Sequence, residues 1–272
     1  FSKGGYGSIP AAFSGWLLQI PIILHESDAL PGLANRLISH WATEIFVSFP
    51  KTEFPSLKKI MVVGNPVRQE LAAGSKEKAK ELFNLVGGKP VVLVLGGSQG
   101  SQRINDLILN ILPDFLKSAE IIHQTGEKNL KNAESEFNAV VTEDKLKPYY
   151  HPVAFLNEEE IKQSYIAANL IISRSGAGSV FEIALTGKPS ILIPLPESAQ
   201  KHQLKNAYSY AASGAAVVLE EENLTSHFFL EKVKYLLANP FELEKMSQAA
   251  KNFSKPRAAL TIAEYIVSFL ID

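Results

Sequence analysis

Ser173-Arg174-Ser175-Gly176-Ala177-Gly178-Ser179-Val180-Phe181-Glu182 lies between two apolar runs, and Gly187 separates it from the second. The pattern predicts a buried strand, a small-residue turn, a short helix that stops at Gly187, and a second buried strand. Gly176 and Gly178 allow backbone angles that other residues resist, and they let a ligand approach the main chain. The free N–H groups of the helix's first turn favour a phosphate. Glu182, one turn inside, can accept hydrogen bonds from a ribose diol. Taken alone, the stretch fits an ordinary strand–helix turn with a solvated Glu182 equally well.

Five further short motifs occur in a fixed order along the chain. They are Gly4-Gly5-Tyr6-Gly7-Ser8, His25-Glu26-Ser27-Asp28, Gly64-Asn65-Pro66-Val67-Arg68, Gly96-Gly97-Ser98-Gln99-Gly100, and His202-Gln203 with Asn206-Ala207. Each motif is weak, but the ordered set resembles the MurG family of UDP-N-acetylglucosamine:lipid I N-acetylglucosaminyltransferases over essentially all 272 residues. The resemblance implies an α/β protein of GT-B type, with two Rossmann-like domains, parallel sheets and an incomplete N-terminal domain.

Composition excludes several classes of protein. With 46% hydrophobic and 20% charged residues, the chain can bury a full core and is not disordered. Its 27 Lys and Arg balance 28 Asp and Glu, so no basic excess indicates nucleic acid. Cysteine is absent, which excludes disulfides and thiol catalysis, and the six His show no metal-ligand spacing. No apolar run reaches the ~20 residues that span a bilayer. Because the first residue is Phe1, we expect a piece that lacks an N-terminal portion.

The resemblance implies two domains. Residues 1–67 would form the acceptor- and membrane-side domain, and residues 68–272 the UDP-GlcNAc-binding domain. Pro66 interrupts regular structure between them, so the hinge is expected there. Apolar runs predict buried parallel strands at 20–24, 44–49, 59–63, 90–95, 119–124 and 148–155. We expect helices at 32–42 and 258–271, the last crossing back toward the first domain.

On the acceptor side, the resemblance implies that the Gly-rich loop at residues 4–8 holds the acceptor's diphosphate together with Asn35. The loop residues are Gly4, Gly5, Tyr6, Gly7 and Ser8. Glu26 would be the catalytic base or orient it, supported by His25. The resemblance assigns Asp28 to the donor. The family often has Asn at this position; an anion there could hydrogen-bond a sugar hydroxyl but would repel phosphate. Phe13, Trp16 and Leu17 share one helix face, which is either core packing or an exposed membrane contact.

On the donor side, the resemblance assigns Arg68 and Ser98 to the diphosphate, the main chain of Leu156 to uracil, and Gln203 to GlcNAc hydroxyls. It also assigns these residues of the first stretch: Arg174, Ala177, Gly178, Ser179, Val180, Phe181 and Glu182. Without the resemblance, Arg68 would be a linker residue, Arg174 a structural salt bridge and Gln203 an exposed helix residue.

The implied reaction is transfer of GlcNAc from UDP-GlcNAc, with inversion, to the MurNAc C4 hydroxyl of lipid I, giving lipid II for peptidoglycan. It needs no metal or other cofactor and takes place at the cytoplasmic face of the bacterial plasma membrane, with the protein peripheral. In the family, a first Gly-rich loop with a His precedes the part that matches this chain, so we expect these 272 residues alone to be inactive. The alternatives are another GT-B lipid glycosyltransferase, a UDP-sugar epimerase, or a non-catalytic UDP-sugar-binding subunit.

Overall fold

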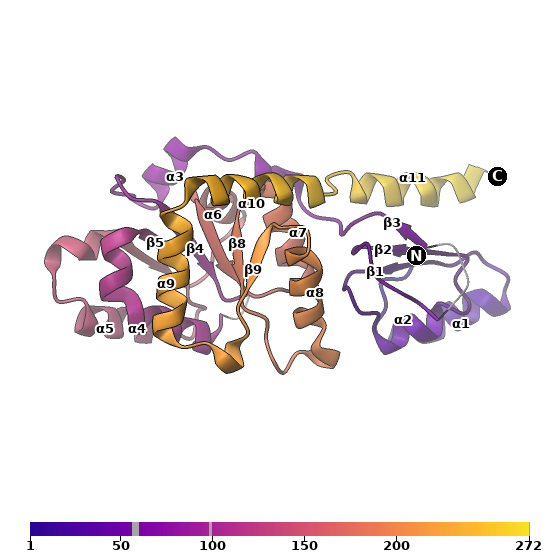
Figure 1. Ribbon diagram of the computed structural model, residues 1–272. Helices are drawn as coiled ribbons and strands as arrows, with labels where there is room; N and C mark the ends of the chain where they lie inside the picture. The colour runs from indigo at the N-terminus through magenta and orange to yellow at the C-terminus, as the bar shows by residue number, and fades with distance from the viewer. Residues whose placement is uncertain (56–59, 98–99, 272) are drawn as a thin grey trace.

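The computed structural model describes residues 1–55, 60–97 and 100–271. These residues form two parallel β-sheets, each covered by helices, which lie side by side along the long direction of the molecule (Figure 1). The long apolar runs of the sequence become the strands, because a parallel strand covered on both faces needs apolar residues at successive positions.

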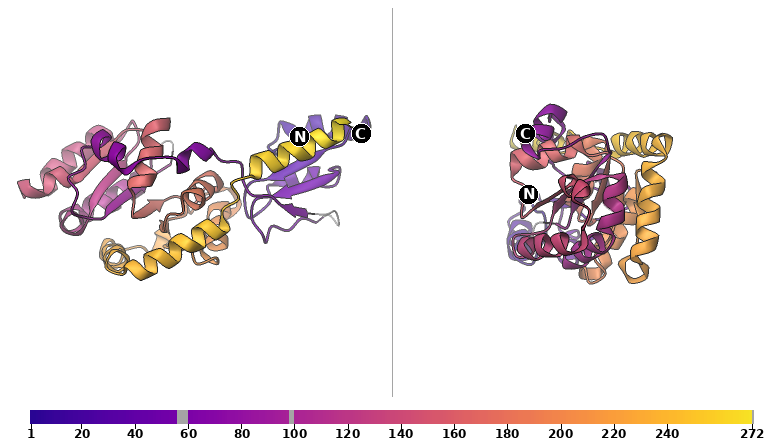
Figure 2. Two further views of the ribbon diagram at one scale, coloured as in Figure 1. Left: turned by 90° about the horizontal axis from the view of Figure 1, so that it is seen from above. Right: turned by 90° about the vertical axis from the view of Figure 1, so that its left-hand side faces the viewer.

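The first sheet contains β1 (Ile23–Glu26), β2 (Glu44–Val47) and β3 (Ile60–Val62) in that spatial order. Helices α1 (Ser8–Leu17) and α2 (Leu33–Ile38) cover one face, where Leu24 and Ile45 are buried. The other face packs on α11 (Ala258–Ile271), and the rings of Phe46 and Tyr265 meet edge to face at 5.1 Å. The C-terminal helix therefore completes the core of the first sheet (Figure 2).

The second sheet has the spatial order β6-β5-β4-β7-β8-β9, all parallel. The strands are β4 (Val91–Leu95), β5 (Glu120–Gln124), β6 (Tyr150–Val153), β7 (Leu170–Ser173), β8 (Ser190–Leu192) and β9 (Ala216–Val218). The chain winds outward from β4 in one direction and then, from β7, in the other. This is the doubly wound Rossmann order, in which ligands bind beyond the carboxyl ends of the strands where the order reverses. Here that point lies between β4 and β7.

Helices cover both faces of the second sheet. One face carries α4 (Gln102–Ser118), α5 (Leu130–Val140) and α9 (Ser226–Leu237). The other carries α3 (Lys76–Leu82), α6 (Glu158–Ala167), α7 (Ala177–Thr186), α8 (His202–Ala211) and α10 (Pro240–Phe253). Short 3-10 turns complete the chain: η1 (Gln69–Ala72), η2 (Asp144–Tyr149), η3 (Ala199–Lys201) and η4 (Glu221–Asn223).

The chain crosses between the sheets near Gly64 and again after α10, and the two crossings touch. Gly64 has a φ of +87°, and a Cβ at this position would lie 2.4 Å from Cβ of Lys255. Gln69 Nε2 donates a hydrogen bond to Pro256 O at 2.7 Å. The expected hinge segment thus runs against the returning chain, while the division at residues 67 and 68 stays a prediction.

Three expected elements are shorter in the structure. The strand expected at 20–24 begins at Ile23, because Gln19 ends α1 with a φ of +56°, and the strand includes His25 and Glu26. The strand expected at 148–155 begins at Tyr150, since the residues before it form η2. The helix expected at 32–42 ends at Ile38.

Candidate functional site

Two loops lie side by side at the carboxyl ends of β4 and β7, and each leads into a helix. In the loop after β4, Gly100 N donates to Gly97 O at 3.0 Å, which closes a tight turn before α4. Gly100 has a φ of +75°, and a Cβ there would lie 2.1 Å from Thr125 O. Only glycine fits this position, so the turn is fixed against the end of β5. Ser98, which we assigned to the donor diphosphate, lies outside the described residues.

The loop after β7 belongs to the stretch of residues 173–182 and leads to the N-terminus of α7. Gly176 is the N-cap and makes no side-chain hydrogen bond to the helix, so N–H groups of the first turn have no capping side chain. Our expectation about backbone angles is wrong here: Gly176 has φ −60° and ψ 146°, which any residue adopts. A Cβ on Gly176 or Gly178 would meet no atom within 4 Å, so the space above this turn is open. Ala177, Gly178 and Ser179 form the first turn, and Val180 and Phe181 are buried in the core.

Arg174 is buried and is held by three partners. Its guanidinium donates to Ile193 O at 3.1 Å, to Ser101 Oγ at 2.7 Å and to the Glu221 carboxylate. These bonds are those of the salt-bridge interpretation that remained open from the sequence. Assignment of Arg174 to direct donor binding stays a prediction.

Glu182 and Arg68 contact each other, although they are far apart in the sequence. Arg68 Nη2 lies 3.4 Å from Glu182 Oε1, and Nη1 lies 3.2 Å from Glu158 Oε1. The buried Tyr165 hydroxyl donates to Glu182 Oε2 at 3.1 Å. Burial and the Glu182 carboxylate raise the pKa of Tyr165, so it remains a donor. Tyr165 therefore fixes one oxygen of Glu182, while its other oxygen meets Arg68 at the surface.

Leu156 and Gln203 already make hydrogen bonds within the protein. Leu156 N donates to Gln124 Oε1 at 3.2 Å, and Gln124 Nε2 donates to Gly97 O at 2.9 Å. Gln203 Oε1 accepts from Leu195 N at 3.0 Å, which leaves its amide NH₂ to donate to a ligand. Gln124 was missed in the sequence, although a polar residue that ends a buried parallel strand is a usable signal.

The Glu26 carboxylate holds the loop that follows β1 by accepting three hydrogen bonds from the loop and from α2. Oε1 accepts from Asp28 N at 2.9 Å, and Oε2 accepts from Gly32 N at 3.1 Å and from Asn35 Nδ2 at 2.7 Å. Burial raises the pKa of Glu26, and these donors oppose the shift. Gly4, with a φ of +87°, lies so close to Asn35 that a Cβ would be 2.2 Å from its Oδ1. Three residues that we assigned to the acceptor side are thus in direct contact.

His25 is completely buried at the end of β1. Its Nε2 lies 3.0 Å from Gly64 O, so that nitrogen carries the proton. Burial lowers the pKa of His25, which keeps the ring neutral. His25 connects β1 to the crossing segment, which supports a structural role near the site.

Asp28 contacts the second domain. Asp28 Oδ1 accepts from Asn206 Nδ2 at 2.8 Å, and Asn206 Oδ1 accepts from Ala29 N at 2.7 Å. Asn206 Nδ2 also donates to Ser175 O at 3.1 Å, and Ser175 Oγ donates to Gln203 O at 2.8 Å. The bonds of Asp28 in the structure are thus to the protein, and its assignment to the donor stays a prediction.

A cavity of about 300 Å³ opens between the two domains. Its lining includes Gly5, Tyr6, Glu26, Asp28 and Asn35 from the first domain and Ala199, Gln200 and His202 from the second. Gly7 and Ser8 adjoin it at the start of α1, where Ser8 Oγ donates to Gly5 O at 2.7 Å. Gln200 and Lys201 have φ values of +51° and +55°, and such strained backbone is common at functional sites. The acceptor-side residues therefore face the second domain across this cavity.

The N-terminal helices carry an exposed apolar surface. Phe13, Trp16 and Leu17 are 43%, 49% and 60% exposed, so the core-packing interpretation of this face is wrong. The Trp16 ring stacks on Trp41, with centroids 6.2 Å apart. Leu18, Ile20, Leu33 and Leu37 extend the exposed apolar area. We call this set, with Phe13, Trp16 and Leu17, the apolar face.

Within the described parts of the chain, no cluster of His, Asp or Glu has the arrangement of a metal site. Among the same residues, no helix combines the length and apolar character needed to cross a bilayer.

The fold defines a class: a GT-B protein, whose second Rossmann-like sheet has an uncapped helix N-terminus at its switch point. Residues 91–262 match the glycosyltransferase family 28 C-terminal domain, and residues 1–47 match the N-terminal domain of that family.

Known relatives narrow the class. One is the UDP-N-acetylglucosamine–N-acetylmuramyl-(pentapeptide) pyrophosphoryl-undecaprenol N-acetylglucosamine transferase of Clostridium tetani, 37% identical over 93% of this chain and 68% of that protein. The transferase of the same name from Clostridium kluyveri is 38% identical over 92% of this chain and 69% of its own length. The crystal structure of Acinetobacter baumannii MurG superposes with a TM-score of 0.78 at 26% identity, covering 98% of this chain and 72% of that one. The chain belongs to glycosyltransferase family 28 and, within it, to the MurG family.

A UDP-GlcNAc 2-epimerase from Neisseria meningitidis shares the fold, with a TM-score of 0.67 at 16% identity over 98% of this chain and 75% of that one. At this identity the likeness shows the fold alone.

Proposed function

We propose that the chain binds UDP-GlcNAc at the switch point and is part of an enzyme that transfers GlcNAc to the MurNAc C4 hydroxyl of lipid I. The observation that carries the proposal is the arrangement around the β7–α7 turn. An uncapped helix N-terminus with open space above Gly176 and Gly178 lies one helical turn from Glu182. Such a turn suits a diphosphate, and a carboxylate suits a ribose diol. The names of the relatives supply the sugar and the acceptor.

The reaction would join the acceptor oxygen to C1 of GlcNAc while the bond from C1 to the UDP oxygen breaks. The hydroxyl proton must go to a base, and the charge that develops on UDP must be stabilised. The N–H groups of the α7 turn and the Arg68 guanidinium are the groups suited to that charge. Glu26 Oε1 accepts one hydrogen bond within the protein, which leaves it capacity to take a proton from a hydroxyl in the cavity.

The apolar face supports a peripheral position on the membrane that carries a lipid-linked acceptor. It lies on α1 and α2, in the domain that also carries the loop of Gly5 and Tyr6 at the cavity. An amphipathic surface of this kind binds at the interface of a bilayer without crossing it. We place the protein at the cytoplasmic face of the bacterial plasma membrane.

Calorimetric titration with UDP-GlcNAc, UDP-glucose and UDP tests the donor assignment. We expect binding of UDP-GlcNAc and UDP, weaker binding of UDP-glucose, and loss of most affinity in Glu182→Ala. Glu158→Ala, which removes the other partner of Arg68 at an exposed position, is the matched control. A folded protein that binds none of the three nucleotides would refute the proposal, and circular dichroism establishes whether it is folded.

A further inference from the structure

The most extended charge network in the described residues starts from the buried Arg174. Its side chain and that of Glu221 are 8% and 14% exposed, and the two form an ion pair. The second guanidinium nitrogen donates to Ser101 Oγ at 2.7 Å. Ser101 is the N-cap of α4 and accepts from Ile104 N at 3.4 Å. Arg174 thus connects the loop after β7 to the first turn after β4.

Glu221 is itself fixed by a second arginine. Its Oε1 accepts from Arg103 Nη1 at 2.7 Å, and Arg103 also binds both oxygens of Glu197, at 2.7 and 3.1 Å. Glu221 lies in η4, directly beyond β9. Glu221, near the edge of the sheet, therefore helps to orient the guanidinium of Arg174, which lies at the centre of the sheet.

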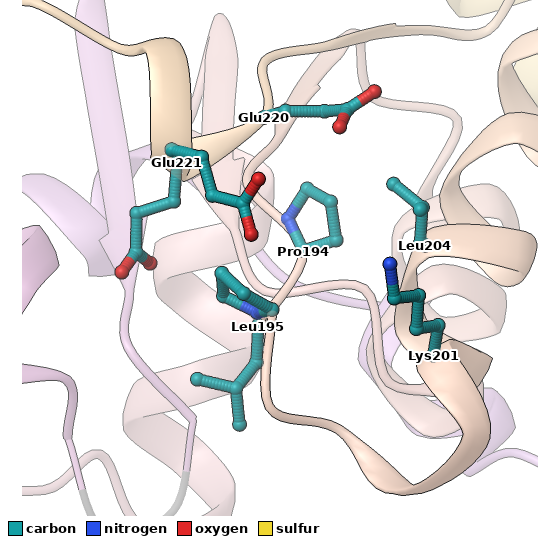
Figure 3. Close-up of a pocket in the computed structure, with 8 residues that line it drawn as sticks. Pro194, Leu195, Lys201, Leu204, Glu220 and Glu221 are labelled. Atoms are coloured by element: carbon teal, nitrogen blue, oxygen red, sulfur yellow. The ribbon is translucent and has the colours of Figure 1, made fainter.

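Glu221 lines two hollows, a small cavity and an open pocket of about 520 Å³ that it shares with Arg103 and Glu197. The small cavity has a volume of about 40 Å³, and Lys201 and Leu204 lie on the opposite side of it, with Pro194 between (Figure 3). The smaller space holds only a few water molecules. Its contact with Arg174 connects Glu221 to the loop after β7, and its contact with Arg103 fixes it in place.

We infer that Glu221 is a positioning residue for diphosphate binding. It orients Arg174, Arg174 holds Ser101, and Ser101 sets the start of α4 and the Gly-rich turn beside the α7 N-terminus. The inference rests on the proposed function, because it assumes that the diphosphate lies over these two turns. Glu221 also balances the charge of Arg174, so this arginine contributes chiefly by geometry.

A purely electrostatic role of Glu221 predicts the opposite result. If it only neutralised Arg174, its removal would leave additional positive charge beside the diphosphate and strengthen UDP binding. If it positions Arg174, its removal weakens UDP binding although the local charge becomes more positive. The sign of the change separates the two roles.

The test compares UDP with uridine, which lacks the diphosphate, in calorimetric titrations of the wild type and Glu221→Gln. We expect UDP affinity to fall about tenfold, the effect of one charge-assisted hydrogen bond, with uridine affinity unchanged. Glu222→Gln, an exposed neighbour with the same change of charge, is the control and should bind both like the wild type. Tighter UDP binding, unchanged UDP binding, or an equal loss for uridine in Glu221→Gln overturns the inference.

Ser101→Ala provides a second variant if Glu221→Gln does not fold. It keeps the ion pair and removes only the hydroxyl that Arg174 holds. Its control is Ser75→Ala, which removes the N-cap of α3 away from the site. We expect Ser101→Ala to reproduce the UDP-specific loss and the double variant with Glu221→Gln to show little further loss. Additive losses would overturn the inference. A wild type that binds neither UDP nor UDP-GlcNAc would instead refute the proposed function.

Discussion

Asn206 and Asp28 form a hydrogen bond between the two domains, with Asn206 Nδ2 2.8 Å from Asp28 Oδ1. The same Asn206 amide accepts from Ala29 N and donates to Ser175 O in the loop before α7. Asn206 and Ser175 are completely buried, so the Asn206 amide relies on these protein partners for its hydrogen bonds. One side chain therefore couples the loop after β1 to the loop that forms the candidate donor site.

Replacement of Asn206 tests this coupling. Asn206→Ala leaves Ala29 N and Ser175 O without their partner, so the free energy of unfolding should fall by about 1–3 kcal/mol. Asn206→Asp should be at least as unstable at neutral pH, because it places a second carboxylate against Asp28. The exchange Asp28→Asn with Asn206→Asp restores one donor and one acceptor and should recover part of the loss. Urea unfolding measures all four proteins, and an exchange variant no more stable than Asn206→Asp would contradict the role of the pair.

Arg68→Ala tests the diphosphate assignment of Arg68 without a large change in stability. Its two ion pairs are exposed, and such pairs contribute at most about 1 kcal/mol. We therefore expect urea unfolding close to that of the wild type, with UDP affinity reduced about tenfold and uridine affinity unchanged. Arg257→Ala, which removes another exposed arginine of an ion pair, serves as the control. Unchanged UDP affinity in Arg68→Ala would assign that residue to the surface alone.

The sheets were predictable from the sequence because buried parallel strands are continuous apolar runs. The run at 90–95 became β4, and the run that ends at Ile172 became β7, extended by Ser173. The Gly-rich stretch at residues 96–100 follows the first of these strands, and the stretch at residues 173–182 follows the second. Their meeting at the switch point could therefore also be expected.

Side-chain pairing was not predictable, because it depends on contacts between distant segments. Asp28 and Asn206 are separated by 178 residues, and Arg174 and Glu221 by 47. No local pattern distinguishes an arginine that binds phosphate from one that binds a distant glutamate. The error about Gly176 has a related cause, since glycine in a turn signals either an unusual φ or the need for space. At Gly176 the structure shows open space around the residue and no unusual φ.

A buried histidine should make the protein sensitive to acid. His123 is enclosed with Tyr150 and Asn105, and burial lowers its pKa to about 3. The unfolded chain takes up this proton near its ordinary pKa of ~6.5, so between pH 6.5 and 3 it binds one more proton than the folded chain. Stability from this group is complete above pH ~6.5 and falls by about 1.4 kcal/mol per pH unit below it.

His25 acts in the same direction, because burial lowers its pKa as well. Urea unfolding at pH 7 and pH 5 should show the loss in the wild type and in His227→Asn, an exposed control. His123→Gln should be less stable at pH 7 but depend less on pH. An equal pH dependence in His123→Gln would show that other groups cause it.

The apolar face should determine membrane binding. Trp16→Glu with Leu17→Glu places two charges where burial of each apolar side chain would contribute about 1.5–3 kcal/mol. We expect at least about tenfold weaker sedimentation with vesicles that contain phosphatidylglycerol. Phe241→Glu, which changes a 73% exposed apolar residue on α10, is the matched control and should bind vesicles normally. Equal binding by all three proteins would exclude the apolar face as the contact.

Two glycine variants separate a requirement of the fold from a requirement of the ligand. Gly100→Ala places a methyl group 2.1 Å from Thr125 O at a φ of +75°, so it should destabilise the protein by about 3 kcal/mol or more. Gly176→Ala has an ordinary φ and open space around its Cβ, so its stability should stay within about 0.5 kcal/mol of the wild type. The new methyl group would nevertheless occupy the approach to the α7 N-terminus, and UDP affinity should fall. If Gly176→Ala binds UDP like the wild type, the diphosphate does not approach the main chain at this turn, and the donor must lie closer to the turn after β4.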